Sequence, residues 1–130
     1  MKKRVIFLLT GLFIWMSSLM AQDVPEKVIG AFKEGSAQEL NKYLGDKVDL
    51  NILNKQNCVD KQGAKETMAA FFSDHKVCGF TVNHYGKRED SGFIIGTLAT
   101  ADGNFRVHCF FRKEQNSYVI HQIRIDNANE

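Results

Sequence analysis

Residues 92–126 decide the fold: GFIIGTLAT (92–100), FRVHCFFRK (105–113) and YVIHQIRID (118–126) are three largely apolar segments of strand length. Asp102-Gly103 separates the first two segments, and Gln115-Asn116 separates the last two. An Asp-Gly pair between alternating segments is the strongest short-range hairpin signal, because a two-residue turn of this kind needs positive φ at both positions. The stretch therefore predicts three antiparallel strands joined by two tight turns.

Three helices are predicted before this stretch. The first begins with a capping box at 23–26 that has Pro25 in its first turn, and it ends at Gly35. The second begins at Ser36 with the same capping chemistry and ends at Gly45. The third begins at Asp60 and carries an apolar stripe at helical spacing, which consists of Ala64, Met68, Phe71 and Phe72.

Further strands complete the predicted sheet. Apolar and polar residues alternate over 48–53, and a turn at 54–57 leads to a short return strand at 58–59. Another strand runs from Phe80 to Gly86, and a charged loop joins it to the stretch at 92–126. Helices followed by consecutive strands predict an α+β domain, with a curved antiparallel sheet whose one face packs on the helices.

The first 21 residues have the composition of a signal peptide. Lys2, Lys3 and Arg4 precede an apolar run from Val5 to Met16 that is too short to span a bilayer comfortably. Cleavage is expected after Ala21, and an uncleaved anchor is the alternative. Residues 22–130 then form one domain of 109 residues that is exported to the periplasm or secreted, with the signal peptide as its one membrane-binding segment.

Charge and cysteine content narrow the classes of function. Without the three basic residues of the signal peptide, 14 Lys and Arg stand against 15 Asp and Glu, a net charge of −1, so no nucleic-acid partner is expected. Cys58, Cys78 and Cys109 have no CxxC spacing, and the sequence indicates neither a metal site nor a cofactor. A disulfide between Cys58 and Cys78 is one hypothesis, and buried free thiols are the other.

Several strings resemble a family of exported proteins from Gram-negative bacteria known as domain of unknown function 4783, within the nuclear transport factor two-like (NTF2-like, or cystatin-like) superfamily. They are Val59-Asp60-Lys61, Phe71-Phe72, Gly96-Thr97-Leu98, Phe105-Arg106-Val107 and the segment 120–125. The resemblance implies a cone-like half barrel whose concave face, closed by the helices, often holds a pocket. It implies no catalytic residue, because the family has no established activity, and the superfamily contains enzymes, carriers and assembly domains.

Alternation of side chains along the strands predicts which residues line such a pocket. In the strand at 105–112 the odd positions are assigned to the core. The pocket candidates are Phe32, Met68, Phe72, Phe80, Val82, His84, Cys109, Phe111, His121 and Ile123. His121 has two alternatives: strict alternation places it on the face of Cys109, whereas a bulge near it turns Ile120, Ile123 and Ile125 inward and His121 to solvent.

The opposite, convex face has the composition of a protein-binding surface. Its candidate interface residues are Arg106, His108, Phe110, Arg112 and Tyr118. Many members of the NTF2-like superfamily, which the chain resembles, pair through this face, and the resemblance therefore implies a homodimer there.

Three functions follow from these two faces. The leading hypothesis is non-catalytic binding of a small apolar ligand or a protein partner. One alternative is a small enzyme of the isomerase, dehydratase or hydrolase kind that uses His84 or His121 as an acid or base, and the other is an envelope scaffold.

Overall fold

The computed structural model describes residues 24–115 and 117–128, which form three helices and six strands. They are α2 (Val24–Glu34), α3 (Ala37–Asn41), β1 (Leu44–Ile52), β2 (Lys55–Asp60), α4 (Lys61–Asp74), β3 (Val77–Lys87), β4 (Ser91–Thr100), β5 (Gly103–Glu114) and β6 (Ser117–Asn127). The predicted signal peptide and the Asp23 cap lie outside the described residues. None of the helices in the described ranges is long and apolar enough to cross a membrane.

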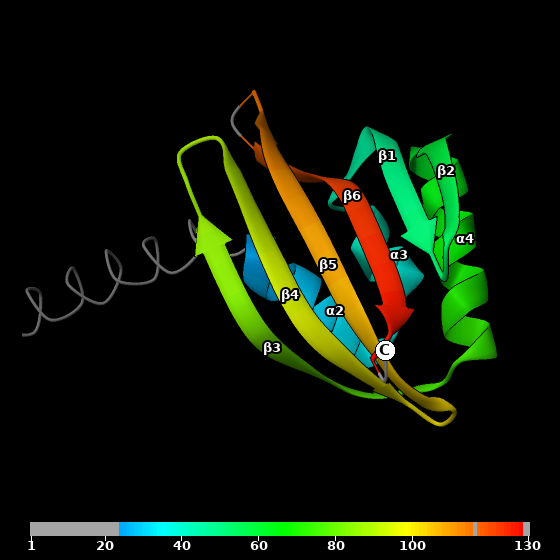
Figure 1. Cartoon of the computed structure of the whole chain (residues 1–130). Coiled ribbons are helices and arrows are strands. Elements are labelled where there is room, and N and C mark those ends of the chain that lie inside the picture. Colours follow the sequence, from blue (N-terminus) through cyan, green and yellow to red (C-terminus); the bar gives the residue numbers. More distant parts are fainter. Residues whose placement is uncertain (1–23, 116, 129–130) are drawn as a thin grey trace, which may run out of the picture.

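The strands form one curved sheet in the order β2-β1-β6-β5-β4-β3 (Figure 1). The predicted α+β fold is confirmed, and the stretch at 92–126 forms the antiparallel strands β4, β5 and β6. One pairing differs from the antiparallel sheet that was expected, because β1 lies parallel to β6 and makes the sheet mixed. This pairing joins the first and last strands of the chain, so local hairpin signals carry no information about it.

Helix boundaries follow the predicted capping residues except at the end of α3. Gly35 takes φ 63° after α2, and the Ser36 hydroxyl accepts a hydrogen bond from the Glu39 N–H at 3.1 Å. Asp60 caps α4 by accepting from the Gly63 N–H at 2.7 Å. The helix predicted to reach Gly45 is shorter, because Leu44 already pairs with Ile120 at the start of β1.

The β4–β5 turn lies one residue earlier than predicted. Thr100 pairs with Gly103, so Ala101 and Asp102 are the turn residues, and neither has positive φ. Gly103 takes φ 134°, and the Thr100 hydroxyl donates to the Gly103 carbonyl at 2.7 Å. The Thr100 side chain therefore supports a turn that needs only the glycine to leave the usual φ range.

The three helices cover the same face of the sheet, and the core lies between them and the strands (Figure 1). Inward residues of the strands alternate with outward ones, and Ile94, Leu98, Val107 and Ile123 are fully buried. We call the side of the sheet that packs on the helices the helix-covered face, and we call the opposite side of β3 to β6 the open face.

Candidate functional site

Most pocket candidates pack against one another in the core. Phe32, Met68, Phe72, Phe80, Cys109, Phe111 and Ile123 are each 8% exposed or less, and Val82 is half-buried beside them. The Phe32 ring stacks on Phe80 at a centroid distance of 5.2 Å and meets Phe72 edge-on at 6.2 Å. Of these eight residues, only Phe111 lines any of the hollows described below. The aromatic side chains therefore fill the space in which a concave-face ligand was expected.

His84 does not lie on the core face, which corrects the assignment from alternation. Val82 pairs with Gly96 and His84 pairs with Ile95, so Asn83 is an extra residue in β3. This bulge reverses the facing of the residues that follow it. His84 is exposed on the open face.

His121 also lies in a bulge, so the second of its two alternatives is confirmed. Phe110 pairs with Gln122 and Phe111 pairs with Ile120, which leaves His121 as the extra residue in β6. Ile120, Ile123 and Ile125 are fully buried, whereas His121 is half-buried. The two bulges thus bring both candidate imidazoles to the same side of the sheet.

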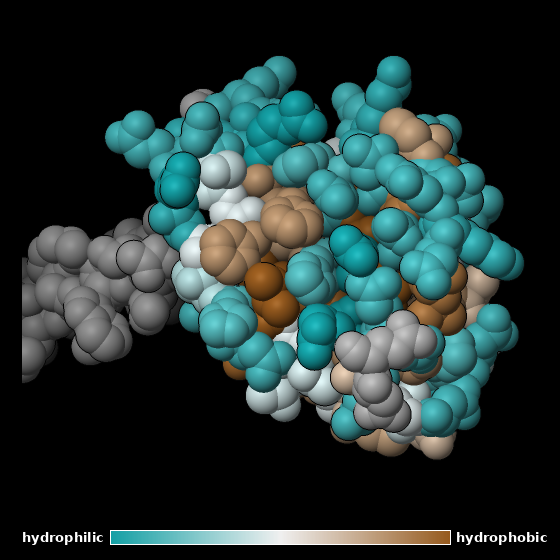
Figure 2. Space-filling model, in the orientation of Figure 1, coloured by the Kyte–Doolittle hydropathy of each residue, from teal (hydrophilic) through white to brown (hydrophobic). Residues whose placement is uncertain are grey.

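Two neighbouring hollows mark the open face. The first, of about 440 Å³, is called the His121 hollow and is lined by Gly86, Lys87, Arg88, Ser91, Gly92, Phe93, Phe110, Phe111 and His121. The second, of about 460 Å³, is called the His84 hollow and is lined by Asn83, His84, Ile95, Thr97, Arg106 and His108. Figure 2, drawn from this side, shows apolar residues at the surface among hydrophilic ones. Both volumes are in the range of small-molecule sites.

Burial and arginine side chains keep two open-face imidazoles, those of His108 and His121, neutral near pH 7. The pKa of His121 is lowered by burial and by Arg112, against the smaller opposing effects of Asp49 and Glu114. The pKa of His108 is lowered by burial and by Arg124 and Arg106, while Asp126 acts in the opposite direction. Each imidazole can therefore offer one N–H donor and one acceptor nitrogen.

Four of the five interface candidates lie on the open face, where β5 presents Arg106, His108, Phe110 and Arg112 between its buried residues. Tyr118 does not, because Ile120, two residues on, faces the core. The Tyr118 hydroxyl lies 2.9 Å from the Arg88 carbonyl oxygen and 2.8 Å from that of Glu89, and can donate to either. Tyr118 therefore holds the β3–β4 loop.

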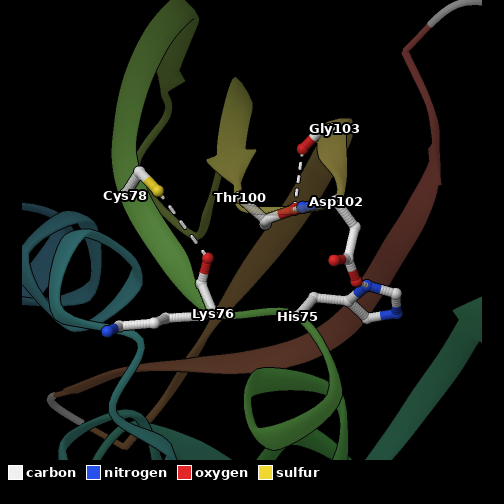
Figure 3. Close-up of polar contacts among 6 residues, drawn as sticks. All are labelled: His75, Lys76, Cys78, Thr100, Asp102 and Gly103. Carbon is white, nitrogen blue, oxygen red and sulfur yellow. Dashed lines mark hydrogen bonds and ion pairs between the residues drawn. The ribbon is translucent and has the colours of Figure 1, made fainter.

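A histidine–carboxylate pair that sequence reasoning missed lies at the other end of the sheet. His75 Nδ1 is 2.8 Å from Asp102 Oδ2 (Figure 3). The His75 ring packs on Phe71 and Phe105 at centroid distances of 4.7 and 4.9 Å. His75 and Asp102 are 27 residues apart along the chain, so no local motif marks the pair. The contact joins the end of α4 to the β4–β5 turn, as does the hydrogen bond from the Ala101 N–H to the Lys76 carbonyl.

The cysteines are free, which corrects the disulfide hypothesis. Cys58 and Cys78 are exposed and Cys109 is buried, so the prediction of buried free thiols holds for Cys109 alone. Burial raises the pKa of the Cys109 thiol far above its usual range. Among the described residues, no group of three or more His, Cys, Asp or Glu side chains is placed to hold a metal ion.

Comparisons with known proteins identify close relatives of the chain. The family model described as "Domain of unknown function (DUF4783)" matches residues 25–126, and no curated protein matches. A crystal structure of a DUF4783 family protein from Bacteroides uniformis is 71% identical, with TM-score 0.81 over 83% of this chain and 100% of the other. Another from Bacteroides fragilis is 61% identical, with TM-score 0.78 over 82% and 100%. An NTF2-like protein of unknown function in nutrient uptake from Rhodospirillum rubrum, at 17% identity and TM-score 0.58 over 79% and 93%, shares the fold.

Proposed function

The chain belongs to the DUF4783 family, and we propose that it is an exported, non-catalytic binding domain that binds its partner on the open face of the sheet. The observation that carries this proposal is the contrast between the two faces. Phenylalanine rings fill the centre of the helix-covered face, which has a hollow of about 290 Å³ at its edge beside Pro25, Ile29 and Tyr85, whereas the open face has two larger hollows and half-buried aromatic side chains. The binding surface is therefore assigned to the face that was expected to mediate pairing.

The composition of the open face supports binding. Phe93, Ile95 and Phe110 are half-buried apolar residues, and Arg106 and Arg112 are exposed beside them on β5. Aromatic and arginine side chains are enriched in protein interfaces, and apolar residues are costly to leave in water. A second copy of the chain is the protein partner that we propose first.

The environment of the imidazoles supports a non-catalytic role. A histidine acid or base is usually oriented by a carboxylate within hydrogen-bonding distance, and in the described part of the chain neither His84 nor His121 has one. His75 has such a partner, but it lines neither the His121 hollow nor the His84 hollow. The His75–Asp102 contact is better explained as a link between α4 and the sheet.

Sedimentation and native mass spectrometry test the binding surface. We expect the wild type to carry a second copy or a retained ligand, and Phe110→Glu to lose it, because a carboxylate there must be desolvated on binding. Tyr85→Glu is the matched control, since Tyr85 is 52% exposed but lies outside both open-face hollows. A wild type without any bound mass, or a Phe110→Glu variant that keeps it, would refute the proposal.

Export has a separate test. We expect the mature protein in the periplasm or medium to begin at Gln22. Sequencing the N-terminus of the exported protein checks this, and an intact Met1 on a membrane-bound protein would instead support the uncleaved anchor.

A further inference from the structure

We infer that the His121 hollow binds an anionic ligand with a flat apolar body, such as an aromatic carboxylate. The inference rests on the proposed function, since it names the class of ligand for one part of the open face. Three features of the hollow carry it: an aromatic wall, an arginine on a loop held by hydrogen bonds, and a hydrogen-bonding imidazole.

The aromatic wall consists of Phe93 and Phe110, which are paired across β4 and β5. Gly86, on the other side of β4, pairs with Phe93 and leaves room for its ring. A Cβ atom at Gly86 would lie 2.6 Å from Phe93 Cζ, so any side chain there would displace the ring. The glycine thus keeps an apolar surface beside the hollow, where a flat ligand can stack.

The charged loop between β3 and β4, which carries Arg88, is held by hydrogen bonds from several elements. The Arg88 N–H donates to the Ser91 carbonyl at 2.8 Å, and the Lys113 N–H donates to the Asp90 carbonyl at 2.8 Å. Tyr118 holds the loop from β6, as described above. Because the backbone is already ordered, binding a ligand need not order the loop and restricts only the Arg88 side chain.

The charge of the lining is positive. Lys87 and Arg88 line the hollow, but the Lys87 ammonium lies 5.3 Å from the centroid of the Tyr118 ring, away from the open face, so Arg88 supplies the positive charge. The loop also contains Glu89 and Asp90, but neither lines the hollow. An anion is therefore attracted to this site, and a cation is repelled.

His121 and Ser91 supply hydrogen-bonding groups in the hollow. A neutral His121 can donate one N–H to an anionic oxygen, and the nearby Arg112 favours the same charge. Asp49 and Glu114 also act on His121 and oppose this effect more weakly than Arg112 does. A bound anion stabilises the imidazolium, so ligand binding should raise the pKa of His121.

The test is a titration with 2-naphthoate and with 2-naphthalenemethanol, a neutral molecule of similar shape, followed by NMR of the aromatic and imidazole resonances. We expect both to shift Phe93 and Phe110, with naphthoate binding about fivefold more tightly through its charge. Arg88→Gln should abolish this preference. Arg106→Gln, which changes the same residue type in the other hollow, should keep it.

Equal affinity for the two probes, equal effects of the two variants, or shifts confined to other surfaces would overturn the inference. One outcome separates the two proposals. If Phe110→Glu disrupts a complex of the wild type, but the wild type binds both probes equally, the ligand class is wrong and the proposed binding surface stands. If the wild type binds neither probe and forms no complex, both fail.

Discussion

Phe32→Ala tests whether the helix-covered face is a packed core or a ligand pocket. Phe32 is 0% exposed, stacks on Phe80 and meets Phe72 edge-on. Replacing a fully buried phenylalanine by alanine removes its transfer free energy and leaves a cavity, which typically costs about 3–5 kcal/mol. A loss of about 4 kcal/mol is a large part of the 5–15 kcal/mol that stabilises a typical domain.

Urea unfolding followed by circular dichroism measures this change in free energy. In thermal unfolding we expect the melting temperature to fall by roughly 15–30 °C. Tyr85→Ala, on β3 but 52% exposed, is the control and should cost about 1 kcal/mol or less. Benzene should partly restore Phe32→Ala, because an apolar cavity of this size can bind it. If Phe32→Ala costs no more than the control, the ring borders open space and the concave pocket must be reconsidered.

Three further predictions concern β4, His121 and the thiols. Gly96→Ala should cost about 1–3 kcal/mol in urea unfolding, since its Cβ atom would lie 2.5 Å from Phe80 Cζ. The free energy of unfolding should fall as the pH drops below 6.5, because the pKa of His121 is lowered in the folded protein and the unfolded chain therefore binds a proton first. Urea titrations at pH 5.5 and 7.5 measure this pH dependence, and His121→Gln should reduce it. Mass spectrometry after iodoacetamide treatment should find two adducts in the native protein, on the exposed Cys58 and Cys78, and three in denaturant, because Cys109 is buried. A native protein without any adduct would instead support a disulfide between Cys58 and Cys78.

The fold could be predicted from sequence because its signals are local. Capping residues at Ser36 and Asp60 start helices where expected, and alternation along β5 assigns both its faces. The parallel pairing of β1 with β6 could not be predicted, because no turn joins these strands. The Asp102-Gly103 signal identified the hairpin but misplaced its turn by one residue, since the Thr100 hydroxyl supports a different turn.

The candidate site was harder to predict, because its position depends on single extra residues in two strands. Alternation has a period of two, so one unpaired residue reverses every assignment after it. Asn83 does this in β3 and places His84 outside. The composition of β6 allowed two registers for His121, and only the pairing of Phe111 with Ile120 decides between them.

These bulges also bear on function. They leave the core with apolar residues such as Ile120 and Ile123, and they put His84 and His121 on a face that already has arginines and aromatic rings. Burying an imidazole in the core would require a hydrogen-bonding partner for it, whereas at a half-buried surface water can satisfy it. The same irregularities that hide the site from sequence reasoning therefore keep its polar groups available for binding, and this favours the open face over the helix-covered face as the functional surface.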